Sequence, residues 1–342
     1  MNLSEEQSLQ VDVGAYDSFF HVFYAFYALI SVSSNFLLIY LLKNRSPSRM
    51  KVFKWLLINT SVSQIGLALL NFFVQERILP SGEVLALLPI GPCFWFGNKV
   101  CFVGYNLINV FNMIVGLSIL HSMHFRYRLI RETQAAERMR LGRPFFLSLL
   151  LPAFLLVTPF FDMYGEAEVM EETRNKHPNY VFHSSFGGFK SVRSPLFLIN
   201  SAILSATAIT LPLITFYWRC AILKTIKDKP SSFKQRTKNS SRALVKVLTL
   251  QAVIPSLCYL PIAVLYPCAQ FLDLELPQVQ YLTTALPAMS CAIDPILSIY
   301  FIAPYRKWVA SCFKGRLLKP SSLKLNRLCP STLSHNPSAT KM

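Results

Sequence analysis

Cys93 and Cys101 frame the segment GPCFWFGNKVC, which stands just before a long apolar run. Two thiols at such a spacing can bind a metal ion, act as a redox pair or close a disulfide. A metal ion would need further ligands, and the connection 76–99 contains no histidine, so we expect neither a metal nor another cofactor. The remaining choice depends on the compartment that the segment faces.

Asn106, Asn109 and Asn112 recur every third residue along the apolar run 100–125, which puts them on one side of a helix. Polar groups are costly in hydrocarbon, so these amides should face other helices. They can line a ligand pocket or form hydrogen bonds between helices. We favour hydrogen bonds for Asn112 and leave both interpretations open for Asn106 and Asn109.

Asp294 is the one carboxylate within an apolar run, 276–303. Its position indicates a structural or switch role alongside Asn35 and Gln64 rather than catalysis. The sequence contains no HExxH, GxSxG or phosphate-binding loop, and its apolar runs contain no pair of catalytic carboxylates. We therefore expect that the protein is not an enzyme.

The chain is 53% hydrophobic and only 15% charged, a composition typical of a membrane protein. A hydrocarbon layer about 30 Å thick requires about 20 apolar residues per helix. We predict an all-α membrane protein, a seven-transmembrane helix bundle over 18–303, between an extracellular N-terminus (1–17) and a cytoplasmic tail (304–342). The predicted spans are 18–42, 55–75, 100–125, 144–161, 195–218, 247–272 and 276–303. Proline, glycine and Glu83 interrupt the apolar stretch 78–97, which we expect to be an interfacial loop.

Lysine and arginine gather in alternate connections. One set of connections holds 27 basic and 3 acidic residues, and the other holds 6 basic and 13 acidic residues. Under the positive-inside rule the first set is cytoplasmic and the N-terminus is extracellular, where a signal anchor rather than a cleaved signal peptide is expected. The net charge of +17 then indicates contact with lipid headgroups and an acidic cytosolic partner, and no nucleic acid. The basic set comprises 43–54, 122–143, 219–242 and 302–342, and the acidic set comprises 1–17, 76–99, 162–194 and 267–278.

This orientation exposes Cys93 and Cys101 to an oxidising compartment, so a disulfide between them is our leading prediction. It would close a short loop and stabilise the fold by about 2 to 3 kcal/mol. Two unpaired thiols, or a bond from one of them to Cys268, remain alternatives.

Three motifs appear in the order and at the membrane depth found in rhodopsin-like G-protein-coupled receptors. CYLP at 258–261 resembles the Cys-Trp-x-Pro of the sixth span, DPILSIY at 294–300 resembles the Asn/Asp-Pro motif of the seventh, and FRYRL at 125–129 stands where Asp-Arg-Tyr closes the third. With GPCFWFGNKVC, LINTSVSQ, LTLQAVIP and DPILSIYFIAPYR, they resemble the nematode serpentine chemoreceptors, class delta, over nearly the whole membrane domain. The str-like classes are the nearest alternatives.

The resemblance implies a chemosensory receptor that binds a small odorant or soluble cue within the helix bundle and activates a heterotrimeric G protein. It also implies the cell membrane of a sensory cilium or dendrite as the location, and it leaves a receptor oligomer open. A multi-span transporter or a ligand-gated channel is the alternative function. Transporters tend to show internal repeats and discontinuous helices, and the sequence shows neither.

The sequence departs from the rhodopsin-like pattern at three places. Residues 162–194 contain no cysteine, so the usual bond from the third span to the second outer loop is impossible. Gln64 replaces the aspartate that shares a sodium ion, which speaks against such a site. Ser298 stands where the motif of the seventh span has tyrosine, and the next tyrosine is Tyr300.

Polar and proline residues in the spans are the candidates for binding and switching. The expected ligand contacts are Asn106, Asn109, Asn200, Tyr259 and Tyr281. The expected switch residues are Cys258, Pro261, Asp294 and Pro295, which belong to the motifs of the sixth and seventh spans. The two prolines can kink their helices.

Arg126 and Arg128 lie at the predicted inner end of the third span. In the receptors that the chain resembles, the arginine at this place is held by a neighbouring carboxylate and contacts the G protein after activation. Here Phe125 replaces that carboxylate. Residues two apart diverge by roughly 200° around a helix, so the two arginines cannot both point into the bundle. We assign the inward role to Arg126, because it directly follows the position that matches the acidic residue of the related receptors, and leave Arg128 to headgroups or solvent. The alternative is that both residues merely mark the inner interface.

The topology makes a testable prediction at both termini. Asn2, in the sequon NLS, faces outward and should be glycosylated. In sealed vesicles with the cytoplasmic face inside, the tail beyond Arg306 should resist added protease, and a glycosidase should shift the mobility of the wild type but not of Asn2→Gln. Digestion of the tail in those vesicles would contradict the topology.

Overall fold

The computed structural model describes residues 13–45, 51–131, 147–161, 163–178, 180, 182, 185–228, 235–271 and 277–313. Asn2 and the tail beyond 313 lie outside the described residues. The chain divides into two compact units, Met1–Arg306 and Lys307–Met342, and the helix bundle lies in the first.

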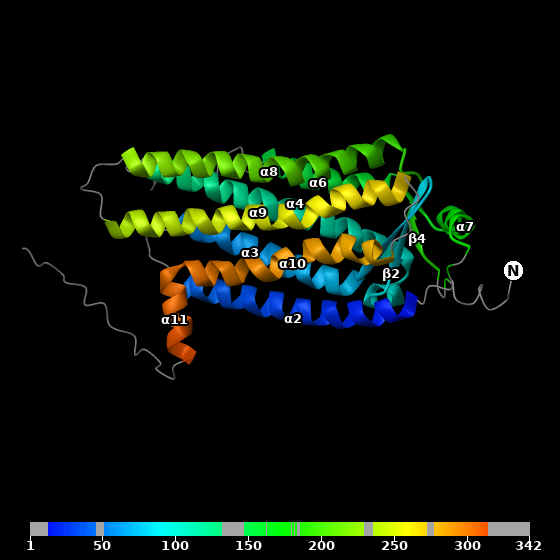
Figure 1. Cartoon of the computed structure of the whole chain (residues 1–342), viewed down its shortest axis with the longest axis horizontal. Coiled ribbons are helices and arrows are strands. Elements are labelled where there is room, and N and C mark those ends of the chain that lie inside the picture. The colour runs from blue at the N-terminus through cyan, green and yellow to red at the C-terminus, as the bar shows by residue number, and fades with distance from the viewer. Residues whose placement is uncertain are drawn as a thin grey trace, which may run out of the picture. The chain divides into compact units, whose positions relative to one another are not determined.

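Seven of the helices that the structure describes lie side by side (Figure 1). They occupy the seven apolar runs, and most extend beyond the predicted span ends. Five are long and apolar enough by themselves to cross a membrane, whereas α6 with η4, and the described apolar part of α9, are shorter. The helices are α2 (Val13–Arg45), α3 (Lys51–Val74), α4 (Asn98–Arg131), α6 (Leu150–Val157) continued by η4 (Thr158–Phe160), α8 (Pro195–Asp228), α9 (Gln235–Phe271) and α10 (Pro277–Phe301), and α11 (Ala303–Phe313) follows across the unit boundary.

The bundle is apolar on both its inside and its outside. In one interior cluster, Phe20 of α2 packs with Leu67 of α3 and Ala285 of α10. On the outside, Phe36 of α2 and Leu213 of α8 are 59% and 64% exposed. Large exposed apolar side chains on helix faces are unfavourable in water but suit contact with lipid.

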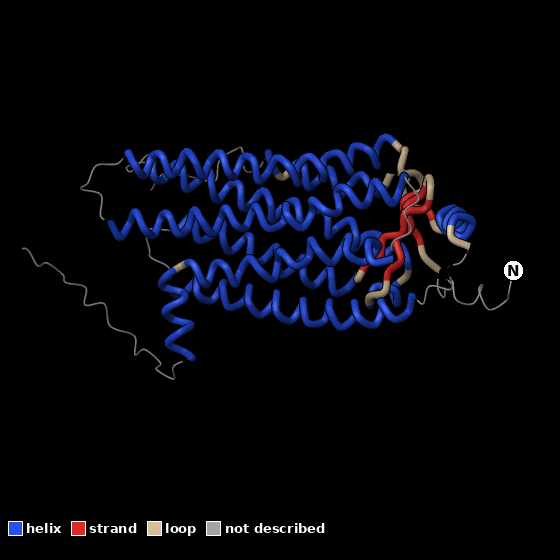
Figure 2. Tube along the Cα trace, in the orientation of Figure 1, coloured by secondary structure: helices blue, strands red, loops and turns tan. Residues whose placement is uncertain are grey.

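An antiparallel sheet closes one end of the bundle (Figure 2). Its described strands are β1 (Glu76–Ser81), β2 (Val84–Pro89), β3 (Tyr164–Gly165) and β4 (Gly187–Phe189), in the spatial order β1-β2-β4-β3. We call these four strands the sheet lid, and this end of the bundle the sheet end.

The hairpin of β1 and β2 corrects the prediction of an interfacial loop over 78–97. Its two-residue turn is Gly82-Glu83, and Gly82 has φ of +64°, a left-handed conformation that suits glycine at the first position of a hairpin turn. Pro80 lacks a backbone N–H but lies in the edge strand β1, where a missing donor is tolerated. The residues that break a helix here are therefore compatible with a hairpin.

The two faces of the sheet lid pack against different layers, because alternate residues of a strand point to opposite sides. One face lies on the helices and the other under α7 (Ala167–Lys176), which Figure 1 shows beyond the strands. The helix-facing cluster includes Ile78, Leu85, Leu87, Phe102 and Phe197. The α7-facing cluster includes Leu79, Val84, Ala86, Val169 and Phe186.

Strand β4 reaches the hairpin through glycine. A side chain at Gly188 would put its Cβ 2.0 Å from the Leu85 carbonyl oxygen, so only glycine fits between β2 and its neighbour at this point. The pairing of Ala86 with Gly188 joins segments about 100 residues apart in the sequence.

A disulfide joins Cys93 to Cys101, with an S–S distance of 2.08 Å. Cys93 lies in η2 (Pro92–Phe96) and Cys101 lies in the first turn of α4, and both are buried against Val74 at the end of α3. Cys268 is free in this structure. The bond ties the segment after β2 to the beginning of α4.

Replacing Cys93 and Cys101 together by serine should lower the free energy of unfolding by about 2 to 3 kcal/mol, because the bond restricts the unfolded chain. Thermal unfolding of the purified protein measures the change, and Cys268→Ser is the control because that thiol is free. Mass spectrometry of unreduced protein that finds both residues alkylated as free thiols would contradict the prediction.

Candidate functional site

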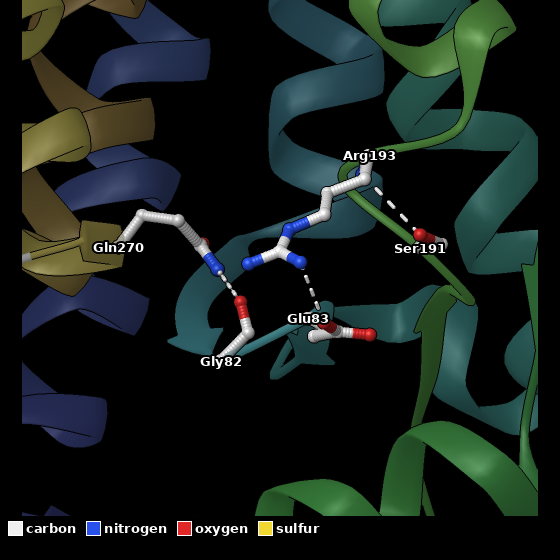
Figure 3. A network of polar contacts seen from close by, with 5 residues as sticks. All are labelled: Gly82, Glu83, Ser191, Arg193 and Gln270. Carbon is white, nitrogen blue, oxygen red and sulfur yellow. Dashed lines mark hydrogen bonds and ion pairs between the residues drawn. The ribbon is translucent and has the colours of Figure 1, made fainter.

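The tip of the hairpin is tied to α9 and to the segment before α8 (Figure 3). The Gln270 side-chain amide donates to the Gly82 carbonyl oxygen at 2.5 Å. The Arg193 guanidinium lies 3.0 Å from the Glu83 carboxylate, and the Val192 N–H donates to the Glu83 carbonyl oxygen at 2.8 Å. Both side chains of the ion pair are mostly exposed, so the ion pair contributes little and the neutral hydrogen bonds hold the tip.

Tyr281, a predicted ligand contact, is buried in a polar and aromatic network at the sheet end. Its hydroxyl donates to the Asp17 carboxylate, its ring stacks on Phe20 at a centroid distance of 4.6 Å, and the Arg77 guanidinium lies 5.0 Å from the ring. The Arg77 Nε donates to the Gln280 side-chain oxygen at 2.8 Å. Tyr281 thus connects α2, β1 and α10.

Asn106, a second predicted ligand contact, lines a cavity of about 270 Å³ between α4 and the α6–η4 segment. Its side-chain amide donates to the Phe102 carbonyl oxygen at 2.8 Å, one turn earlier in the same helix. The other lining residues are Lys99, Phe102, Val103, Leu156, Pro159, Phe160 and Tyr164. The cavity is therefore mainly apolar, with polar groups at few points.

Asn109 and Asn200, also predicted ligand contacts, both lie close to other polar side chains. The Asn109 side chain lies within electrostatic reach of the Tyr105 hydroxyl. The Asn200 amide donates to the Thr158 hydroxyl oxygen at 2.8 Å, and that hydroxyl donates back to the Asn200 oxygen at 3.1 Å. The side chain of Tyr259, the last predicted contact, lies outside the described part of the chain.

Buried polar side chains connect the helices in the middle of the bundle. The Gln64 amide of α3 donates to Asp294 Oδ2 of α10 at 2.7 Å. The Asn35 amide of α2 donates to the Cys291 carbonyl oxygen of α10 at 3.3 Å. The three residues that sequence analysis grouped therefore all converge on α10.

Gln251 extends this polar core to α9 and was missed by the sequence analysis. Its side-chain amide donates to the Ser298 hydroxyl of α10 at 3.1 Å, and both residues are buried. Ser298 is the position where rhodopsin-like receptors have tyrosine. The available signal was an amide side chain inside the apolar run 247–272.

The predicted switch residues lie on α9 and α10. Cys258 is half-buried and Pro261 is exposed on α9. Pro295 lies inside α10, which continues through it and through Pro287. Their part in a conformational switch stays a prediction.

Arg126 and Arg128 differ in burial at the end of α4 opposite the sheet lid. Arg126 is only 6% exposed, whereas Arg128 is exposed. The buried Tyr305, which follows α10, lies within electrostatic reach of Arg126. The two arginines thus point to different surroundings, as residues two apart on a helix must.

The arrangement of the helices matches a known fold. It is similar to the crystal structure of squid rhodopsin, with a TM-score of 0.62 over 90% of this chain and 88% of that chain at 18% sequence identity. The fold is therefore the seven-transmembrane helix bundle, which confirms the predicted fold class.

The chain belongs to the family described as "Serpentine type 7TM GPCR chemoreceptor Srd", whose profile matches residues 20–311. This confirms the resemblance that the motifs indicated. Serpentine receptor class delta-51 of Caenorhabditis elegans is 28% identical over 85% of this chain and 86% of its own length. Serpentine receptor class delta-40 of the same organism is 26% identical over 90% of this chain and 98% of its own length.

The bond between Gln64 and Asp294 should couple α3 to α10 energetically. In a double-mutant cycle, Gln64→Ala and Asp294→Ala should show a coupling free energy of about 1 kcal/mol, because hydrogen bonds between membrane helices are worth roughly that much. Thermal unfolding in detergent provides the values. The pair Gln64→Ala and Asn200→Ala, whose side chains have other partners, should be additive, and additivity in the first pair would contradict the coupling.

Proposed function

We propose that this chain is a chemosensory receptor that binds a small odorant or soluble cue at the sheet end of the bundle and activates a heterotrimeric G protein at the opposite end. Membership of a chemoreceptor family supports the chemical sensing. The burial of Arg126 is the observation that supports coupling to a G protein. A transporter or channel, which the sequence left open, fits a chemoreceptor family poorly.

Arg126 carries a charge in a position where solvation is poor. Removing a charged group from water has a free-energy cost, so a buried arginine at this end of α4 is a candidate for a functional role. Phe125 cannot hold it as the usual neighbouring carboxylate would, and Tyr305 is the aromatic hydroxyl group within its electrostatic reach. In the proposed mechanism Arg126 contacts the C-terminal helix of the G protein when α9 moves outward.

The movement of α9 has an identifiable local cost. The Gln251 side chain of α9 donates to Ser298 of α10, and outward movement of α9 breaks this bond. Hydrogen bonds between membrane helices contribute about 1 kcal/mol, a barrier that a bound ligand can offset. Cys258 and Pro261 on the same helix are the proposed points of bending.

The proposed orientation has the N-terminus and the sheet lid outside the cell and Arg126 facing the cytosol. The disulfide in the segment before α4 supports it, because disulfides persist in oxidising compartments. The proposed location is the cell membrane of a sensory cilium or dendrite, with Asn2 glycosylated. The proposed partners are the lipid bilayer, the chemical cue and the G protein, and a receptor oligomer remains open.

Arg126→Ala should abolish G-protein activation while surface expression persists, because the variant removes the guanidinium and leaves the outer face of α4 intact. Activation of the G protein in cells that express the receptor, normalised to surface amount, measures the effect. Arg128→Ala is the matched control and should retain most activity, because Arg128 is exposed. Equal loss in both variants, or loss in neither, would contradict the role of Arg126.

A further inference from the structure

Glu76 is a buried acid on the helix-facing side of the sheet lid, and it takes no part in the bonds between helices described above. It is the first residue of β1 and is 3% exposed. It lies on the same face of the strand as Ile78, whose side chain packs on the helices, so the carboxylate is directed into the bundle. Neither of its oxygens has a hydrogen-bond partner among the residues that the structure describes.

Two tyrosines lie near the Glu76 carboxyl group, and residues of two further helices lie close by. Tyr24 of α2 and Tyr105 of α4 lie within electrostatic reach of it. Thr284 of α10 donates its hydroxyl to the Glu76 carbonyl oxygen at 2.6 Å. Tyr266 of α9 packs in the cluster that holds Tyr105, and its buried hydroxyl has no partner in the described part of the chain. Tyr24 and Tyr105 thus approach the acid from α2 and α4, and Tyr266 of α9 lies within electrostatic reach of Tyr105.

Burying the Glu76 carboxyl group without a hydrogen-bond partner has a free-energy cost. Burial raises the pKa of the Glu76 carboxyl well above its usual range, because the ionised form loses its hydration. Arg77, the next residue, points to the other face of β1 and is engaged by Gln280 and Tyr281. Buried acids in folded proteins are normally paired or hydrogen-bonded, so an acid left in this state indicates a ligand that supplies the partner.

We propose that Glu76, Tyr24, Tyr105 and Tyr266 form the binding site for an organic cation, a protonated amine or a quaternary ammonium group. The carboxylate supplies the opposite charge, and tyrosine rings attract ammonium groups through their faces. The proposal rests on the proposed function, because it names the chemical class of the cue that the receptor would bind.

The chemistry of the site favours an ammonium group over a metal ion. Within the described residues no group of three or more His, Cys, Asp or Glu side chains is placed to hold a metal. A single carboxylate among aromatic rings provides too few oxygen ligands for a hard metal cation, but it matches the size and low charge density of an ammonium group.

The charge of the surrounding connections agrees with a cationic ligand. The four connections assigned to the sheet-end side hold 13 acidic and 6 basic residues. A field of one sign over an opening raises the local concentration of ions of opposite sign. The connections are 1–17, 76–99, 162–194 and 267–278.

Choline and its neutral carbon analogue 3,3-dimethylbutan-1-ol test the site on the purified full-length receptor in nanodiscs. Choline at millimolar concentration should raise the melting temperature by at least about 2 °C, because a ligand that binds only the folded state stabilises it. The neutral analogue, which has the same shape without the charge, should give no shift. Absence of a choline shift, or equal shifts for both compounds, would overturn the proposal.

Glu76→Gln keeps the size of the side chain and removes its charge. The variant should melt at about the same temperature as the wild type without ligand, since burial already favours the neutral acid, and it should lose the choline shift because the amide cannot ionise to pair with the ammonium group. Glu83→Gln, at the exposed hairpin tip, is the control and should keep the shift. A choline shift that persists in Glu76→Gln would overturn the proposal.

Glu76→Asp tests whether the carboxylate binds choline if Glu76→Gln does not fold. It keeps the charge but withdraws it by one methylene, so choline should need a concentration at least several-fold higher for the same shift. An unchanged concentration dependence would overturn the proposal. Arg126→Ala separates this site from the proposed coupling, because it should keep the choline shift and lose only G-protein activation.

Discussion

The absence of water in the hydrocarbon layer is the constraint on which the rest of this structure depends. A polar group there must find its partner within the protein. Gln64 meets Asp294 at 2.7 Å and Gln251 meets Ser298 at 3.1 Å, so polar residues of three spans become bonds between helices. These bonds hold the helices in register. Apolar contacts alone would do so weakly, because an apolar side chain can contact lipid as favourably as another helix.

The same constraint explains why the sheet end is built from strands. The connection between α3 and α4 folds back over the helices, where unpaired backbone groups would be poorly solvated. Pairing of β1 with β2, and of β2 with β4, satisfies these groups and leaves one apolar face for the helices and another for α7. Glu76 departs from this pattern, because neither oxygen of its buried carboxyl group has a hydrogen-bond partner in the described part of the chain, and this supports the proposed ligand.

A single helix touches the three places that matter for the proposed receptor. On α10, Thr284 contacts the backbone of Glu76, Asp294 receives the bond from α3, and Ser298 receives the bond from α9. At a rise of 1.5 Å per residue, Thr284 and Ser298 lie about 21 Å apart along the helix. A change at the sheet end can therefore reach α9 through one continuous element that carries prolines at 287 and 295.

The amino-acid sequence by itself determined the seven spans, because the length of an apolar run and the thickness of a bilayer are the only quantities required. It also determined that Arg126 and Arg128 face different surroundings, because helix geometry sets that angle. The grouping of Gln64 with Asp294 followed from the cost of polar groups in hydrocarbon.

The tertiary structure alone decided the sheet lid and the surroundings of Glu76. Local signals at Pro80 and Gly82 predict only that a helix ends, whereas the strands depend on pairing Ala86 with Gly188, about 100 residues away. From the sequence alone, an acid at the end of an apolar run is expected to lie at the membrane interface in contact with water. Glu76 is buried because the lid turns this face of β1 toward the helices and brings Tyr24 of α2 and Tyr105 of α4 near it. No sequence period encodes that convergence of distant segments.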